Sequence, residues 1–468
     1  MKTFSGWIFC AWGLYAPVLT GLLFAAVAAA GAVAAAGAAA DQEQAKLTIA
    51  PLRSTLKAGM KQTTWIRVGL EGPPADATKK RAPVNLALVL DKSGSMQGDK
   101  IEQARRAAID ALALLSSTDI VSVITYDSTV SVLVPATRIT DRDAVVAAIR
   151  GIQASGNTAL FAGVSKGAAE VRKFLDREHV NRIILLSDGL ANVGPSSPGE
   201  LGSLAVSLQK ENISVSTLGL GLGYNEDLMV QLAGKSGGNH HFIEQATELA
   251  DIFRREFDDV LSVVAQEVDL KIEIPEGIRP VRVLGNDADI NGQQIVTRMA
   301  QIYSRQHRHV VIELEIPAGE SGGRRDLAAV SASYTNLKTA ATDQLAGTVS
   351  VEFSDSDQKV AASLDKSVMA DVVALVSSDQ NKLATRYLDE GRLDLCRQTL
   401  RENVDYLKMN DDLLPGDTRL RVLSELNETQ LRRLDGVESN TDARANSARK
   451  SFRALQNSVD QQQKLNVP

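Results

Sequence analysis

Hydrophobic and polar residues alternate in different ways along the chain. In the first strand-like region the two kinds of residue take turns, as in Thr64-Trp65-Ile66-Arg67-Val68. A period of two predicts half-buried antiparallel strands. From Val84 onward, short apolar runs instead alternate with stretches of helical periodicity. The two-residue alternation then returns at 268–274 and 310–316, so a different kind of structure is expected between the two sets of strands.

The middle of the chain predicts a doubly wound α/β sheet. Residues 84–90 form an almost uninterrupted apolar run, as expected of a parallel strand that is covered on both faces. Strands that alternate with helices indicate a mostly parallel, Rossmann-like sheet with helices on both faces. Further strands are expected at 120–126, 130–134, 180–186, 213–218 and 241–243, and helices at 100–115, 141–152, 159–175 and 246–264.

The change of pattern on both sides of the α/β segment predicts an insertion. Strands within 41–78 and 265–355 are expected to form one antiparallel β-sandwich, with the α/β unit of 79–264 inserted between them. Residues 356–468 predict a helical C-terminal region, which contains a helical hairpin around Gly391. Its end, 427–463, has few apolar residues and is expected to be a surface helix or partly disordered.

The first 40 residues contain a single charged residue, Lys2. The run Ala38-Ala39-Ala40 fits the small-residue pattern that signal peptidase cleaves. The uncharged stretch is also long enough to span a bilayer, since about 20 apolar residues suffice. Residues 1–40 are therefore either a signal peptide or an N-terminal membrane anchor. Both interpretations export the body of the protein, to the periplasm or cell envelope of a bacterium, as a secreted or membrane-anchored chain.

The composition of the chain limits the classes of function that the protein can have. Of 468 residues, 44% are hydrophobic and 23% are charged, enough apolar material for a buried core. The formal net charge of −6, without a dense Lys/Arg block, argues against nucleic-acid binding. Membrane contact is expected only through the N-terminal segment, if it is not cleaved. Cys10 lies in the leader, so the rest of the chain has one cysteine, Cys396, which cannot form an internal disulfide or a thiolate zinc site. Cys396 is expected to be a buried, small hydrophobic residue, and an intermolecular disulfide is the alternative.

Oxygen-bearing side chains follow several of the predicted strands. The sequence Asp91-Lys92-Ser93-Gly94-Ser95-Met96 comes after the first strand, Thr158 comes just before a helix, and Asp188 follows the strand at 180–186. Ligand sites in open α/β sheets form at the carboxyl ends of the strands. Carboxylates and hydroxyls without His or Cys suit a hard cation. The predicted metal ligands are Asp91, Ser93, Ser95, Thr158 and Asp188.

These motifs resemble those of the von Willebrand factor type A domain over roughly residues 79–262. Asp-Lys-Ser-Gly-Ser-Met, Gly-x-Thr-Ala-Leu and Leu-Ser-Asp-Gly occur in the order and spacing of that family. The five predicted ligands match all five positions of its metal-ion-dependent adhesion site. The flanking pattern is similar to that of bacterial exported proteins with this domain and, more distantly, to inter-alpha-trypsin inhibitor heavy chains.

The resemblance implies a Mg²⁺ site, at which Ca²⁺ and Mn²⁺ are alternatives. In the family's geometry Ser93, Ser95 and Thr158 would contact the ion directly, whereas Asp91 and Asp188 would act largely through water. One coordination position stays open for an Asp or Glu of a protein partner. The chain is therefore expected to be a non-enzymatic, cell-envelope protein-binding module. The alternative is a structural subunit of an envelope assembly, in which the metal mainly stabilises the fold.

Three other patterns resemble catalytic or metal-binding motifs but favour structural roles. Residues 163–167 have the letters of a Gly-x-Ser-x-Gly nucleophile elbow but fall inside a predicted helix. His240 and His241 are adjacent on a strand, so they point to opposite faces and are expected to be structural or solvent-facing. His307 and His309 share one face of a strand, which is expected to be an exposed polar face.

Overall fold

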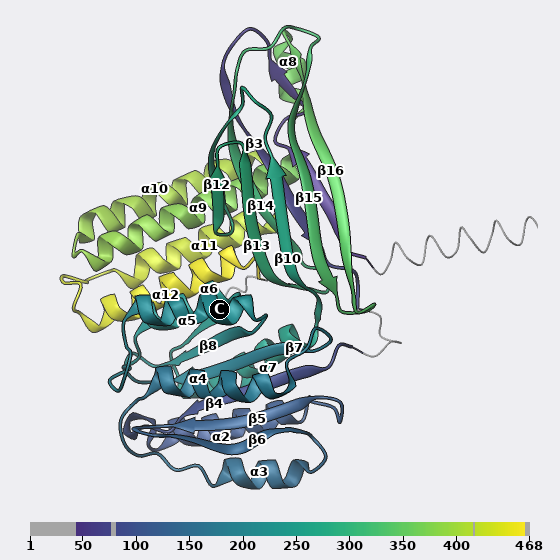
Figure 1. Ribbon diagram of the computed structural model, residues 1–468. Helices are drawn as coiled ribbons and strands as arrows, with labels where there is room; N and C mark the ends of the chain where they lie inside the picture. The colour runs from purple at the N-terminus through teal and green to yellow at the C-terminus, as the bar shows by residue number, and fades with distance from the viewer. Residues whose placement is uncertain (1–43, 76–80, 415–416, 464–468) are drawn as a thin grey trace, which may run out of the picture. The chain divides into compact units, whose positions relative to one another are not determined.

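Figure 1 shows the computed structural model, which describes residues 44–75, 81–414 and 417–463. Every element discussed here belongs to one compact unit that begins at Ala45. The leader predicted at 1–40 lies outside the described residues. Within the described ranges, no helix has both the length and the apolar character needed to cross a membrane.

The α/β part of the chain is built on one six-stranded sheet in the order β6-β5-β4-β7-β8-β9. All neighbouring strands are parallel except β6, which is antiparallel to β5. Every residue of the central strands β4 and β7 is buried, as their apolar runs predict. The strands are β4 (Val84–Asp91), β5 (Ile120–Tyr126), β6 (Val130–Arg138), β7 (Val180–Ser187), β8 (Ser214–Leu220) and β9 (His240–Ile243).

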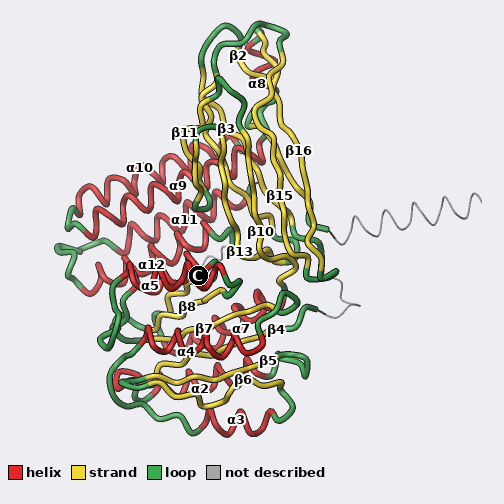
Figure 2. Tube along the Cα trace, in the orientation of Figure 1, coloured by secondary structure: helices red, strands yellow, loops and turns green. Residues whose placement is uncertain are grey.

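Helices pack on both faces of this sheet, which confirms the doubly wound fold (Figure 2). Leu86 and Leu88 of β4 share a core with Phe253, whereas Ala87 and Val89 belong to a separate core on the other face. Successive strand residues point to opposite faces, so one strand contributes to both cores. The first face carries α2 (Asp99–Leu112), α3 (Arg142–Arg150) and α7 (Leu249–Leu261), and the second carries α4 (Leu160–Val171), α5 (Pro198–Lys210) and α6 (Glu226–Ser236).

Two further sheets form a β-sandwich, with strand orders β1-β3-β14-β11 and β12-β13-β10-β15-β16-β2. Strands β1 to β3 precede the α/β unit and β10 to β16 follow it, so the unit is inserted into the sandwich. Pairing is antiparallel except between β16 and β2. The strands are β1 (Lys46–Pro51), β2 (Thr55–Lys57), β3 (Gln62–Glu71), β10 (Val263–Glu273), β11 (Arg279–Leu284), β12 (Ala288–Asn291), β13 (Gln294–Tyr303), β14 (His307–Ile316), β15 (Arg324–Asn336) and β16 (Ala341–Ser354).

The C-terminal helices α9 to α12, which we name the helical layer, cover the outer face of the four-stranded sheet. Val311 of β14 and the half-buried Trp65 of β3 share a core with Leu375 and Leu423 of this layer. Both faces of that sheet are therefore buried. The helices of the region are α8 (Asp357–Ala362), α9 (Lys366–Asp389), α10 (Leu393–Leu413), α11 (Thr418–Arg433) and α12 (Ala443–Asp460).

The prediction that 427–463 is a surface helix or partly disordered is wrong. Helix α12 buries Phe452 in a core with Ala445 and Ala448, and its Lys450 is fully buried as well. The Lys450 ammonium donates to Glu226 Oε2 of the α/β unit at 2.6 Å. Small and polar residues thus take the place of the large apolar side chains whose absence led to the wrong interpretation.

Helix α12 also covers the edge strand β9 of the α/β sheet. The backbone N–H of His240 donates to Asn457 Oδ1 at 2.9 Å, so a side chain of α12 satisfies a group that an open sheet edge leaves unpaired. The contact is buried, with Asn457 6% exposed. This edge of the α/β sheet is therefore closed by the C-terminal region of the same chain.

Replacing Asn457 by alanine should lower the free energy of unfolding by about 1–3 kcal/mol, because the buried N–H of His240 loses its acceptor. Asn446 of the same helix provides the matched control, since its hydrogen bond to Leu222 O is exposed. Urea unfolding of Asn446→Ala should differ from the wild type by no more than about 0.5 kcal/mol. Equal effects of the two substitutions would contradict this role of Asn457.

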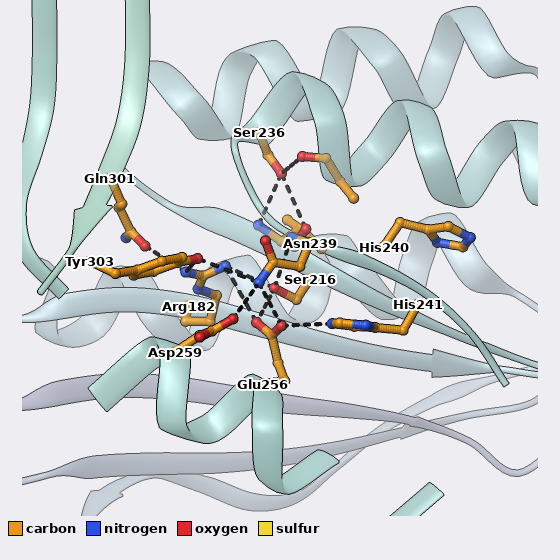
Figure 3. Close-up of polar contacts among 12 residues, drawn as sticks. Arg182, Ser216, Ser236, Asn239, His240, His241, Glu256, Asp259, Gln301 and Tyr303 are labelled. Carbon is orange, nitrogen blue, oxygen red and sulfur yellow. Dashed lines mark hydrogen bonds and ion pairs between the residues drawn. The ribbon is translucent and has the colours of Figure 1, made fainter. Parts of the chain in front are cut away.

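A buried polar cluster joins the α/β unit to the sandwich (Figure 3). Arg182 of β7 donates to Gln301 Oε1 of β13 at 2.5 Å and to Ser216 Oγ of β8 at 2.8 Å. Glu256 of α7 accepts from Ser216 and faces the Arg182 guanidinium at 3.6 Å. His241 Nε2 lies 3.1 Å from the second oxygen of Glu256. The last helix of the α/β unit is thus tied to its own sheet and, through Arg182, to the sandwich.

Candidate functional site

The five predicted metal ligands lie together at the carboxyl edge of the α/β sheet. Ser95 Oγ donates to Asp188 Oδ1 at 2.6 Å and lies 3.1 Å from Ser93 Oγ. Asp91, the last residue of β4, accepts from the backbone N–H of Ser93 at 2.8 Å. Thr158 reaches the same place from the loop before α4. We name this cluster the Asp91 site.

Three hydroxyl oxygens of the Asp91 site converge on one point in front of Gly189. A β-carbon built on Gly189 would lie 2.9 Å from Thr158 Oγ1, 3.4 Å from Ser95 Oγ and 3.8 Å from Ser93 Oγ. Gly189 has no side chain, so this point is left open between the hydroxyls. The arrangement is a cradle of neutral oxygen donors with two carboxylates close by, which is a donor set that fits a hard divalent cation.

Hydrogen bonds between the loops hold the cradle in shape. The N–H of Gly94 donates to Gly156 O at 2.9 Å, and the N–H of Thr158 donates to Asn192 Oδ1 at 2.9 Å. Gly156 has a φ of +75°, and a β-carbon there would lie 2.9 Å from Ser128 Oγ, so the turn before Thr158 requires glycine. The loops that follow β4 and β7 and precede α4 are therefore mutually braced.

One side of the Asp91 site is buried and the other side is exposed to solvent. Asp91 and Asp188 are 0% and 1% exposed, whereas Ser95 is exposed to solvent. Burial raises the pKa of Asp91, and hydrogen bonds from Ser93 and Ser187 oppose this shift. A bound cation would favour the charged form of this carboxyl. An ion held in the cradle would meet solvent on the Ser95 side.

The sequence did not identify Lys100 as part of this site. Its ammonium donates to Asp188 Oδ2 at 2.5 Å, and its side chain is 36% exposed. Asp188 is thus held from one side by Ser95 and from the other by a cation of the chain itself. The one feature of the sequence that could have indicated this contact is the position of Lys100, in the first turn of the helix that follows the Asp91 motif.

The structure also shows where the other candidate residues of the sequence lie. His240 is buried and contacts Thr217 Oγ1 at 2.9 Å, and burial lowers its pKa to about 3, so the structural role expected of it is confirmed. Ser165 lies inside α4 and not at a strand-to-helix turn. Cys396 is buried in α10, and burial raises the pKa of its thiol to about 12.

The prediction that His307 and His309 form an exposed polar strand face is wrong. His309 is 6% exposed and His307 is partly buried, because α9 packs over this face of β14. The strand pattern alone gave no sign of the covering helix, which follows some 50 residues later in the chain. Asp371 of that helix lies 3.8 Å from His309 Nε2, measured to Oδ1.

A family model for the von Willebrand factor type A domain matches residues 85–255. The uncharacterized protein sll0103 of Synechocystis sp. is 26% identical over 68% of this chain and 77% of its own length. Human inter-alpha-trypsin inhibitor heavy chain H4 is 31% identical over 40% of this chain and 21% of its own length. The E3 ubiquitin-protein ligase WAV3 of Arabidopsis thaliana is 22% identical over 51% of this chain and 32% of its own length.

Two solved structures share the fold beyond the α/β unit. A von Willebrand factor type A protein from Catenulispora acidiphila superposes with a TM-score of 0.65 at 15% identity, over 82% of this chain and 90% of that one. The ArnB paralog VWA2 from Sulfolobus acidocaldarius gives a TM-score of 0.59 at 16% identity, over 89% and 98%. The family-model match places a von Willebrand factor type A domain at residues 85–255, and domains of this class mediate protein–protein interaction or adhesion and typically bind a divalent metal.

Proposed function

We propose that the protein is a non-enzymatic binding module of the cell envelope, in which the Asp91 site holds Mg²⁺ and captures an acidic side chain of a protein partner. The observation that carries the proposal is the convergence of Thr158, Ser95 and Ser93 on the open point at Gly189. Hydroxyls leave the charge of the cation under-compensated, so a carboxylate from a partner can complete its coordination shell. Ca²⁺ and Mn²⁺ would fit the same donors with different affinities.

Apolar side chains beside the Asp91 site support a protein as the partner. Leu190 directly follows Gly189 and is 59% exposed, and Leu222 is 38% exposed. The loop of Leu222 lies against the site, since a β-carbon on Gly223 would lie 2.6 Å from Asp188 O. Protein interfaces combine such an apolar contact with a few specific polar ones. We therefore expect the partner to present an Asp or Glu next to an apolar residue.

A structural subunit of an envelope assembly is the alternative, because Asp91 and Asp188 are buried and a metal beside them would also stabilise the fold. Adding EDTA to a pull-down from envelope extract distinguishes the two functions. Loss of the captured partners with EDTA supports the binding module. A lower melting temperature with unchanged partners supports the structural subunit.

Replacing Thr158 by alanine should remove the heat of Mg²⁺ binding in calorimetric titration. Thr158 Oγ1 has no hydrogen-bond partner among the described residues, so its loss leaves no protein group unpaired and should change stability little. Ser203→Ala serves as a control, because it removes an exposed hydroxyl of α5 that is not among the predicted ligands. A Thr158→Ala protein that binds Mg²⁺ with the same heat and affinity as the wild type would contradict the metal assignment.

A further inference from the structure

A second group of metal-binding side chains lies between β14 and the helical layer. His307 and His309 are two residues apart on β14, and Asp371 comes from α9. One ligand atom from each of the three lies within 4.8 Å of the other two. The imidazole rings are stacked, with 4.9 Å between their centroids. The cluster belongs to the outer face of the four-stranded sheet and shares no residue with the Asp91 site.

Each imidazole has a nitrogen without a hydrogen-bond partner among the described residues. His307 Nε2 lies 2.7 Å from Thr48 Oγ1, which leaves its Nδ1. His309 Nδ1 is buried and has no hydrogen-bond partner. The other nitrogen of this ring, Nε2, is the one that faces Asp371, and it has no hydrogen bond among the described residues either, so it is free to bind an ion shared with Asp371.

The spacing of the cluster is too wide for direct hydrogen bonds and suits a bridging ion. His309 Nε2 and Asp371 Oδ1 are 3.8 Å apart, beyond the usual hydrogen-bond range. A zinc ion bonds to His nitrogen and to carboxylate oxygen at about 2.0–2.2 Å, so it can join atoms at roughly this separation after a small adjustment. Gly69 is paired with His309 across the two strands. A β-carbon at Gly69 would lie 2.5 Å from His309 Cβ, so a side chain at this position would clash with His309.

Two arginines already donate to Asp371, and they do not use all of its acceptor positions. Arg67 donates to Oδ2 at 2.5 Å and Arg419 donates to Oδ1 at 2.6 Å. A carboxylate has about four acceptor positions, so two of them remain. The positive charge is partly balanced, because Arg419 also pairs with Asp417 at 2.6 Å and Glu71 stands opposite His307 in the strand pairing.

We propose that His307, His309 and Asp371 bind Zn²⁺ or a chemically similar divalent transition ion, which fastens α9 to β14. Two imidazoles and one carboxylate, with water in the remaining position, are a common donor set for such ions. Mg²⁺ prefers oxygen ligands, so it is not expected here. This site would strengthen the attachment of the helical layer to the sandwich, whatever the Asp91 site does.

The test uses the full chain with Thr158→Ala, so that the Asp91 site contributes no metal binding. Calorimetric titration with Zn²⁺ should show one ion per chain, and Zn²⁺ but not Mg²⁺ should raise the melting temperature. Co²⁺ in place of Zn²⁺ should give visible absorption bands that report nitrogen ligation. His307→Gln should weaken Zn²⁺ binding by more than about tenfold, since even removing a hydrogen-bond partner of a ligand costs about 10–100-fold.

His309→Gln should have the same effect. If circular dichroism shows that His309→Gln does not fold, because His309 is the more buried of the two, His307→Gln decides the outcome. His179→Gln is the matched control, because His179 also contacts a carboxylate, Asp176, but has no second histidine beside it. Its Zn²⁺ affinity should equal that of the parent. Absence of Zn²⁺ binding by the folded parent, or unchanged binding in His307→Gln, would overturn the proposal.

Discussion

Replacing Gly189 by alanine is expected to abolish Mg²⁺ binding, although the substitution removes no ligand. The added methyl group would stand 2.9 Å from Thr158 Oγ1 and 3.4 Å from Ser95 Oγ, at the point where the hydroxyls converge. Gly189 does not have a positive φ, so alanine should not strain the backbone. The effect would therefore be steric and local to the Asp91 site.

Gly199 offers the control for this prediction. It lies in the first turn of α5, and a β-carbon there would meet nothing within 4 Å. Calorimetric titration should give wild-type Mg²⁺ binding for Gly199→Ala and no binding heat for Gly189→Ala, with both proteins folded by circular dichroism. Normal affinity in Gly189→Ala would show that the ion, if bound, does not sit among these hydroxyls.

The residues that gather at the Asp91 site could be found from sequence because each lies in a short local motif. Asp91 follows an unmistakable buried strand, Asp188 follows another, and the carboxyl ends of parallel strands meet at one edge. The supporting residues were not predictable in the same way. Asn192 acts through its side chain on the backbone of Thr158, 34 residues earlier, and no periodicity reveals such a contact.

The errors share one physical cause, which is contact between distant segments. The strand pattern predicts an exposed face for His309 because the helix that covers this face follows later in the chain. Helix α12 was assigned to the surface because its buried positions include Lys450, whose ammonium is satisfied by Glu226, 224 residues away. Burial of a polar residue depends on its partner, so composition alone misjudges helices that dock through paired charges.

Replacing Arg182 by leucine is expected to cost about 3–5 kcal/mol of unfolding free energy, because it leaves Glu256 buried without its cation. Both side chains are 0% exposed. Although burial opposes it, the hydrogen bond from His241 and the charge of Arg182 hold the pKa of Glu256 below its usual range, so Glu256 is charged. Urea unfolding measures the loss, and Gln301 of the sandwich would lose its donor as well.

Arg177→Leu is the matched control, because Arg177 is 73% exposed and its ion pair with Glu267 spans 3.6 Å at the surface. Such a pair contributes about 0–1 kcal/mol. If Arg182→Leu costs no more than Arg177→Leu, the buried cluster does not hold α7 in place. A large difference would support the cluster as the attachment of α7, through the contacts of Glu256 with Ser216 and His241 and of Arg182 with the sandwich.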